Sequence, residues 1–244
     1  MLILALDSST RLGSVALVRQ RAPVAEYTLS VQRTHAERLL PAVAQVLRGA
    51  GCTPADLEAL AVTRGPGSFT GLRIALATAK GLAYALNRPV VGVSTLEALA
   101  YGVSGWAGFV CPLLDARRGE AYAAVYRTLP GGGVERSSDY LALPVPAILD
   151  RLDEVAPEGR VAFVGDAVPL HRQLLQGRLG ERAIFPGEAV AALRASWVGA
   201  LAAERLERGE SDPLDRLVPL YVRPPEAEVR WAERQGKEGE PVCS

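Results

Sequence analysis

The most constraining feature of the sequence is a glycine-rich turn that leads into an unusually apolar helix, in residues 64–86 (RGPGSFTGLRIALATAKGLAYAL). At about 100° per residue, the non-polar side chains cover an arc of roughly 220° around the helix axis. This arc is about twice the width of the apolar stripe that is sufficient to pack on one sheet. Arg73, Lys80 and Tyr84, with Ala77, form the remaining polar strip. One sheet cannot cover this helix, so a second cover is needed.

A second helix, predicted for residues 34–50, has the same property, because its apolar arc covers about 200°. Thr34 and Glu37 have the spacing of a capping box, and Gly49 or Gly51 would end the helix. Pro41 lies inside this pattern and should bend or divide the helix, since proline lacks a backbone N–H.

The second cover could come from elsewhere in the chain, namely a second lobe or a long C-terminal helix, or from a protein partner. We expect a partner, because an exposed apolar patch of this size would otherwise favour aggregation. Small side chains on the helix after the turn would let a neighbouring backbone approach closely. The predicted partner interface comprises Leu39, Ala42, Val46, Gly71, Ile74, Ala75, Thr78, Gly81 and Ala85.

The first hundred residues read as one α/β lobe, predicted for residues 1–104. Apolar runs at 2–7, 13–18 and 24–31 predict three strands in a meander. After the first helix, residues 58–63 and 90–94 predict two further buried strands, separated by the glycine-rich turn and its helix.

A weak internal repeat predicts a second lobe in residues 105–187. An apolar strand ends in Asp7, and a polar turn and Gly13 lead to another strand; Asp115 and Gly119 repeat this order in residues 109–127. Chance is the alternative, since the pattern is a common hairpin signal. We expect a loop at 129–139 and a strand at 161–166. A helix at 188–209 should pack back on the lobes within a segment 188–223, followed by a loose tail at 224–244.

The glycine-rich turn does not match the known phosphate-binding loops. No Gly-Lys-Ser/Thr follows it, and its glycine spacing is not that of dinucleotide-binding proteins. The plainer explanation is steric: Gly65 and Gly67 allow positive φ, Ser68 or Thr70 caps the helix, and Gly71 admits a close neighbour.

Composition excludes several classes of protein. Twenty-seven basic residues balance 27 acidic ones, which argues against binding nucleic acid unaided. Three distant cysteines and two histidines without ligand-spaced neighbours predict neither a disulfide framework nor a metal site. The sequence has no apolar run of the roughly 18–20 residues that span a bilayer, and we expect a cytoplasmic protein.

Five motifs together resemble the TsaB (YeaZ) family. They are LALDSST at 4–10, THAERLLP at 34–41, GPGSFTGLR at 65–73, VGVSTLEALA at 91–100 and LLDARRGEAYAA at 113–124. The resemblance covers the first half of the chain. It implies an actin-like ATPase (ASKHA) fold of two related lobes, the second reduced.

The resemblance also implies a role in making threonylcarbamoyladenosine (t6A) at adenosine 37 of tRNAs that read codons beginning with A. In that family the chain is a partner of a homologous catalytic subunit, TsaD, and a small ATPase, TsaE, joins them. The two apolar helices contact TsaD, or a second copy of the chain when it is alone, and tRNA is reached only through the complex. Both dimers would use one surface, and the sequence leaves open whether they coexist.

The metal centre of the catalytic relatives is missing from this sequence. Those relatives carry two metal-binding histidines four residues apart, in a stretch like HMEGH. Thr95 and Leu99 occupy the matching positions here, and neither can replace imidazole as a ligand. We therefore predict no catalytic residues and no metal.

The phosphate turns of the actin-like fold are also degraded. Asp7, Ser8 and Ser9 keep part of the first turn without its glycines, and in the second turn Arg117 and Arg118 would crowd a phosphate. We predict no cofactor, with weak nucleotide binding at Asp7, Ser8 and Ser9 as the remaining option.

The sequence thus predicts a non-catalytic subunit that docks on a metal-bearing homologue. The alternative is an autonomous actin-like ATPase or small-molecule kinase, which Asp7, Asp115 and the glycine-rich turn favour. A metallopeptidase is disfavoured because the ligands are missing.

Overall fold

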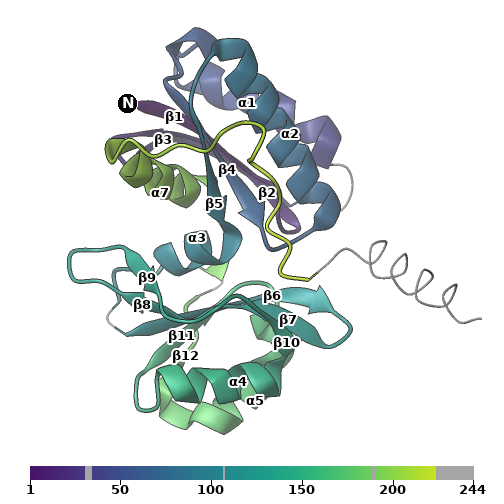
Figure 1. Ribbon diagram of the computed structural model, residues 1–244, viewed down its shortest axis with the longest axis vertical. Coiled ribbons are helices and arrows are strands. Elements are labelled where there is room, and N and C mark those ends of the chain that lie inside the picture. The colour runs from purple at the N-terminus through teal and green to yellow at the C-terminus, as the bar shows by residue number, and fades with distance from the viewer. Residues whose placement is uncertain (31–34, 107, 188–190, 224–244) are drawn as a thin grey trace, which may run out of the picture.

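The computed structural model describes residues 1–30, 35–106, 108–187 and 191–223. Figure 1 shows two lobes, each built on one sheet, with α3 (Thr95–Tyr101) and α7 (Ala195–Glu207) between the sheets. A buried core cluster that draws on both sheets, α3 and α7 joins the lobes. This is the predicted two-lobed actin-like fold.

The first lobe holds a five-stranded sheet in the order β3-β2-β1-β4-β5. Its strands are β1 (Leu2–Asp7), β2 (Leu12–Arg19), β3 (Ala22–Ser30), β4 (Ala59–Gly65) and β5 (Val90–Ser94). The first three strands form the predicted antiparallel meander, and β4 and β5 run parallel to β1. Every residue of β1 is buried, including Asp7 at its end, and the apolar run 2–6 is typical of a strand covered on both faces.

Two helices, α1 (His35–Gly49) and α2 (Phe69–Leu86), cover one face of this sheet. A short 3-10 helix, η1 (Pro54–Asp56), precedes β4. The helix α1 continues through Pro41, so the option that the proline divides the helix is wrong. The predicted capping box includes Thr34, which lies outside the described residues.

The second lobe repeats the path of the first. Its main strands are β6 (Phe109–Arg117), β7 (Glu120–Ala123), β10 (Leu141–Pro144), β11 (Val161–Val164) and β12 (Ala183–Ile184). They lie in the order β10-β7-β6-β11-β12, with the same pattern of antiparallel and parallel pairs as in the first lobe. The internal repeat predicted from Asp7 and Asp115 is therefore confirmed.

The second lobe also differs from the expectation in one place. Strands β8 (Tyr126–Thr128) and β9 (Val134–Arg136) form an added hairpin, so the stretch 129–139 is not entirely a loop. Helices α4 (Val145–Val155) and α5 (Val168–Leu179), followed by η2 (Gly180–Arg182), pack on the outer face of the sheet.

The predicted helix at 188–209 is shorter than expected. Residues 192–194 are not helical, and α7 begins at Ala195 after an extended Arg194. The side chains of Ser14 and Glu26 accept hydrogen bonds from the backbone N–H groups of Ala195 (3.0 Å) and Ser196 (3.0 Å). These partners satisfy the free donors of the first turn and fix where the helix starts.

After α7, residues 208–223 form a C-terminal strap along the first lobe (Figure 1). The Asp212 carboxylate accepts a hydrogen bond from Gly92 N (2.8 Å), which ties the strap to the edge strand β5. Leu217 is buried against α2, and its carbonyl accepts a hydrogen bond from Lys80 (3.2 Å). The chain itself therefore supplies part of the second cover that α2 needs, through this strap rather than through α7.

Candidate functional site

The glycine-rich turn packs against the β1–β2 turn of the same chain. Ser8 Oγ donates a hydrogen bond to the carbonyl of Gly71 (2.7 Å), and Ser68 N donates to the carbonyl of Ser9 (2.7 Å). A Cβ atom at Gly71 would lie 1.8 Å from the Ser8 carbonyl oxygen, and one at Gly67 would lie 2.3 Å from that of Ser9. The close neighbour expected at Gly71 is thus the β1–β2 turn.

The predicted phosphate turn is buried beneath this contact. Asp7, Ser8 and Ser9 are each at most 1% exposed. One carboxylate oxygen of Asp7 accepts hydrogen bonds from Ser9 N (3.0 Å), Ser9 Oγ (2.6 Å) and Thr63 Oγ1 (2.6 Å). These contacts hold the β1–β2 turn against β4. Asp7, Ser8 and Ser9 therefore stabilise the first lobe.

The equivalent turn in the second lobe is open to solvent. Asp115 is exposed, and its carboxylate accepts a hydrogen bond from Arg117 N (2.8 Å). Arg117 and Arg118 both adopt positive φ, at 64° and 56°. The side chain of Asp166, which follows β11, accepts a hydrogen bond from Asp115 N (3.0 Å).

The positions that match the histidines of the catalytic relatives are part of the core. Thr95 and Leu99 lie on α3 and are 0% and 1% exposed. Among the residues that the structure describes, no three His, Cys, Asp or Glu side chains lie close enough together to hold a metal ion. His171 lies on α5 in the second lobe.

Glu97 is a carboxylate on the first turn of α3, close to the junction of the lobes. Burial raises the pKa of Glu97, and the positive charges of Arg205 and Arg136 oppose that rise. A raised pKa means that the folded state binds this proton more tightly than the unfolded chain does. The stability that this proton provides is complete below the unfolded pKa of about 4.5 and is lost as pH rises through the folded pKa.

We therefore predict that Glu97→Gln flattens the pH dependence of stability. Relative to the variant, the wild-type chain should lose free energy of unfolding as pH rises from about 4.5 through the folded pKa. Urea titrations at a series of pH values would measure this difference. Two parallel curves would show that Glu97 has no shifted pKa in the folded state.

The nine residues of the predicted partner interface fall into two groups. Five of them are buried inside the first lobe and are not available to a partner: Leu39, Ala42, Val46, Gly71 and Ala75. Ile74 and Thr78 are half-buried, and Gly81 and Ala85 are exposed. Any interface on these helices therefore uses their outward sides.

The outward sides carry apolar residues that were absent from the predicted set. Leu40 is 54% exposed and Tyr84 is 79% exposed. We define the helix face as the exposed residues Leu40 and Ala44 of α1 and Ala77, Gly81, Tyr84 and Ala85 of α2. The helical spacing of Ala77, Tyr84 and Gly81 could have revealed this surface, had the position of the sheet been known.

An aromatic cluster lies where the strap reaches the start of α2. The rings of Phe69 and Tyr221 stack with centroids 5.7 Å apart, and the Arg73 guanidinium lies 3.9 Å from the centroid of Phe69. Arg73 Nε also donates a hydrogen bond to the Tyr221 hydroxyl (3.2 Å). Phe69 and Tyr221 remain 44% and 37% exposed, so this cluster lies at the surface of the first lobe.

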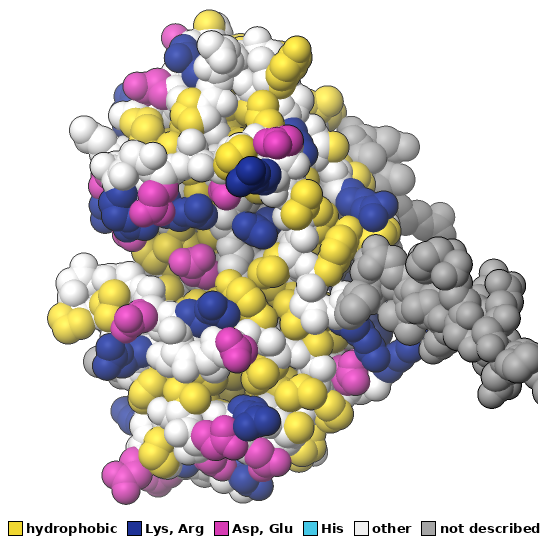
Figure 2. Space-filling model, in the orientation of Figure 1, with side chains coloured by type: hydrophobic (Ala, Val, Ile, Leu, Met, Phe, Trp, Pro, Cys, Tyr) yellow, Lys and Arg dark blue, Asp and Glu magenta, His cyan; other side chains and the backbone are white. Residues whose placement is uncertain are grey.

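On the face of the molecule drawn in Figure 2, basic and acidic side chains are interspersed rather than gathered by sign. This view therefore offers no broad basic surface for a polyanion. None of the helices within the described part of the chain is both long and apolar enough to cross a membrane.

Comparison with known proteins assigns the chain to a family. The family model for TsaD, described as tRNA N6-adenosine threonylcarbamoyltransferase, matches residues 26–231. The TsaB protein of Bacillus subtilis, a tRNA threonylcarbamoyladenosine biosynthesis protein, is 34% identical over 236 residues, which cover 96% of this chain and 100% of the relative. The TsaB protein of Escherichia coli is 32% identical over 241 residues, covering 98% and 100%.

The fold agrees with this assignment. The solved structure of YeaZ from Pseudomonas aeruginosa superposes with a TM-score of 0.73 at 32% identity, over 91% of this chain and 99% of that chain. The matches in sequence extend over nearly the full length, well beyond the five motifs of the first half. The chain therefore belongs to the TsaB (YeaZ) family.

Proposed function

We propose that this chain is a non-catalytic subunit in the biosynthesis of threonylcarbamoyladenosine in tRNA. It binds a homologous catalytic subunit, TsaD, through the helix face, and the pair recruits the small ATPase TsaE. Alone, the chain pairs with a second copy through the same surface. The relatives named TsaB support a role in this biosynthesis, and the match to the TsaD family model supports homology to the catalytic subunit.

The observation that carries this proposal is the exposed helix face. The sheet covers one side of α2 and the strap covers another, yet Tyr84 still has 79% of its surface exposed. Gly81 has nothing within 4 Å of the position of a Cβ atom, so a partner's backbone can approach α2 closely there. Aromatic residues such as Tyr84 are enriched at protein interfaces.

The burial of the β1–β2 turn and of α3 supports a role without nucleotide or metal. A phosphate at the β1–β2 turn would have to displace the glycine-rich turn, because Ser8 and Ser9 already contact Gly71 and Ser68. Thr95 and Leu99 are packed in the core that joins the lobes. We propose that the threonylcarbamoyl chemistry takes place on the partner.

A subunit without catalytic residues can still raise the partner's activity. Burial of the helix face would favour one arrangement of the partner's lobes and of its tRNA-facing surface, which is a coupling free energy between two sites. With equal numbers of acidic and basic residues, this chain would meet tRNA only through the complex.

We predict that the catalytic homologue from the same genome modifies tRNA poorly alone and well when this chain is added. The measurement is threonylcarbamoyladenosine formed per unit time on an unmodified tRNA, with the threonylcarbamoyl donor and all other factors held constant. Coupling energies of about 1–3 kcal/mol correspond to a rise of roughly 5- to 150-fold. Equal rates with and without the chain would refute the proposal.

An autonomous ATPase or small-molecule kinase remains the second candidate, because Asp115 is exposed at the second turn of an actin-like fold. ATP turnover by the purified chain tests it. Turnover that disappears in Asp115→Asn would favour the kinase, since that substitution removes the charge of an exposed side chain and keeps its shape.

A further inference from the structure

Large apolar side chains that are exposed to solvent concentrate on three neighbouring elements of the first lobe. The described part of the chain has ten such side chains. Five of the ten lie on α1, α2 or the C-terminal strap: Leu40, Phe69, Tyr84, Val218 and Tyr221. These three elements make up less than a quarter of the described residues. Exposed apolar side chains that gather in one region mark an interaction surface.

The strap contributes its own exposed apolar side chains to this region. We define the strap patch as Phe69 of α2 together with Val218 and Tyr221 of the strap; Val218 is 50% exposed. Arg73 holds the two rings in place, because its guanidinium lies over Phe69 and its Nε donates to the Tyr221 hydroxyl. Aromatic rings that are fixed before binding lose little conformational entropy in a complex.

The glycine-rich turn fixes the position of the strap. Gly65 has a φ of 116°, and a Cβ atom there would lie 2.8 Å from the carbonyl oxygen of Leu220. The backbone N–H of Leu220 donates a hydrogen bond to the carbonyl of Arg64 (2.6 Å). The first glycine of this turn therefore gives the strap room to pack beside the start of α2.

The strap patch is continuous with the helix face. At about 100° per residue, four exposed residues of α2 lie within about 80° around the helix axis: Phe69, Arg73, Ala77 and Tyr84. Lys80 lies in the same stripe and donates a hydrogen bond to the carbonyl of Leu217, which places the strap alongside it. One surface thus runs from Tyr84 along α2 and onto the strap.

The helix face is too small to form a stable interface by itself. A stable interface buries about 800 Å² on each partner and uses roughly 20–30 residues a side. The helix face has six residues, and four of them are alanine or glycine. A partner that docks on α2 must therefore contact neighbouring surface as well, and the strap patch is apolar surface joined to the helix face through Arg73.

We propose that the strap patch is part of the surface that binds the catalytic homologue, so that the interface combines α1, α2 and the C-terminal strap. The proposal rests on the proposed function and extends its site beyond the two helices. Tyr221 and Phe69 serve as anchors at one end of the interface, as Tyr84 does at the other.

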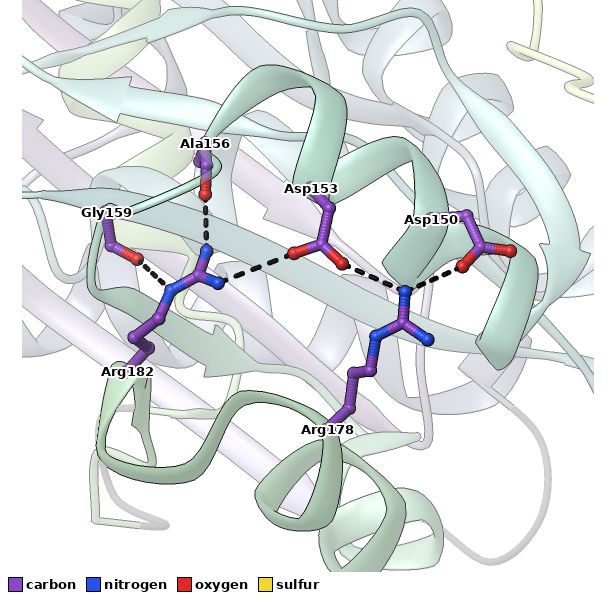
Figure 3. Close-up of polar contacts among 6 residues, drawn as sticks. All are labelled: Asp150, Asp153, Ala156, Gly159, Arg178 and Arg182. Carbon is purple, nitrogen blue, oxygen red and sulfur yellow. Dashed lines mark hydrogen bonds and ion pairs between the residues drawn. The ribbon is translucent and has the colours of Figure 1, made fainter.

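The second lobe supplies a matched control surface. On its outer face, Figure 3 shows Arg178 between Asp150 and Asp153 (both 3.0 Å). The same helix, α5, also exposes Leu170 and Leu174. In Figure 1, α5 lies at the opposite end of the molecule from α1 and α2, so these leucines are not continuous with the helix face.

The test is the affinity of the full chain for the catalytic homologue, measured by isothermal titration. The double variant Val218→Asp, Tyr221→Ala should raise the dissociation constant at least about tenfold, because it removes an aromatic anchor and would bury an unpaired charge. The control is Leu170→Asp, Leu174→Ala, which makes a similar change on α5 and should leave the constant unchanged.

Two single variants separate direct contact from support of the strap. Tyr221→Phe keeps the ring that stacks on Phe69 and loses only the hydroxyl, so its affinity should stay within about threefold of the wild type. Val218→Asp changes an exposed side chain and should weaken binding while the strap stays bound. Hydrogen exchange of the Leu220 amide, which is bonded to Arg64, shows whether the strap is bound in each variant.

The outcomes distinguish this inference from the proposed function. If Ala85→Arg abolishes binding but the changes at Val218 and Tyr221 leave it unchanged, the inference is overturned and the proposed function is kept. If those changes abolish only self-association, as measured by sedimentation velocity, the strap patch binds a second copy and the inference is again overturned. A wild-type chain that does not bind the catalytic homologue would overturn the proposed function and the inference with it.

Discussion

Replacing Gly71 with alanine should lower the free energy of unfolding by at least about 3 kcal/mol, because the new methyl group has no room. Its Cβ atom would lie 1.8 Å from the carbonyl oxygen of Ser8 and 3.0 Å from the carbonyl carbon. The obstacle is backbone, so no side-chain rotation can relieve the overlap. The β1–β2 turn would have to move, which would break the hydrogen bond from Ser8 Oγ to the Gly71 carbonyl.

Gly81→Ala is the matched control on the same helix. Nothing lies within 4 Å of a Cβ atom at Gly81, and alanine is favoured over glycine in a helix interior by roughly 1 kcal/mol. Gly81→Ala should therefore raise stability slightly while Gly71→Ala lowers it strongly. Urea unfolding of both variants at one low protein concentration measures the difference. Similar midpoints for the two variants would show that the contact between the turns is not rigid.

Gly71 also shows how far the sequence could predict this contact. The glycine spacing in 65–71 indicated a close neighbour, since only a missing side chain explains a glycine at that point of an apolar helix. The neighbour itself was not predictable, because Ser8 lies 63 residues away and belongs to a turn that looked like a phosphate site. The local pattern predicts that a residue without a side chain is required at Gly71. The identity of its neighbour, Ser8, follows only from the order of the strands in the sheet.

The cover of α2 was predicted only in part, for a similar reason. The width of its apolar arc correctly required more than one sheet, but the sequence between Arg208 and Arg223 has no helical or strand period that would identify a covering element. The structure shows this strap bound through single contacts, such as Asp212 with Gly92 and Lys80 with Leu217. Because the strap covers one side of α2, the outward surface is centred on Tyr84 and Ala77 rather than on Ile74.

Enlarging Ala85 should abolish most of the binding to the catalytic homologue. Ala85 is exposed next to Tyr84 on the helix face, where small side chains let a neighbouring helix approach. The side chain of Ala85→Arg would hold the partner away from α2 and prevent the burial of Tyr84. Loss of a central contact of this kind costs about 2–4 kcal/mol, which corresponds to a dissociation constant roughly 30- to 1,000-fold higher.

Two further variants separate bulk from charge in that experiment. Ala85→Gln adds bulk without charge and should lose most of the same affinity, since steric exclusion is the main cause. Gly177→Arg places the same side chain on the exposed surface of α5, where nothing lies within 4 Å of a Cβ atom. Isothermal titration with the catalytic homologue should give the wild-type affinity for Gly177→Arg. If Ala85→Arg also binds like the wild type, docking does not use the outward side of α2, and the interface must lie elsewhere on the chain.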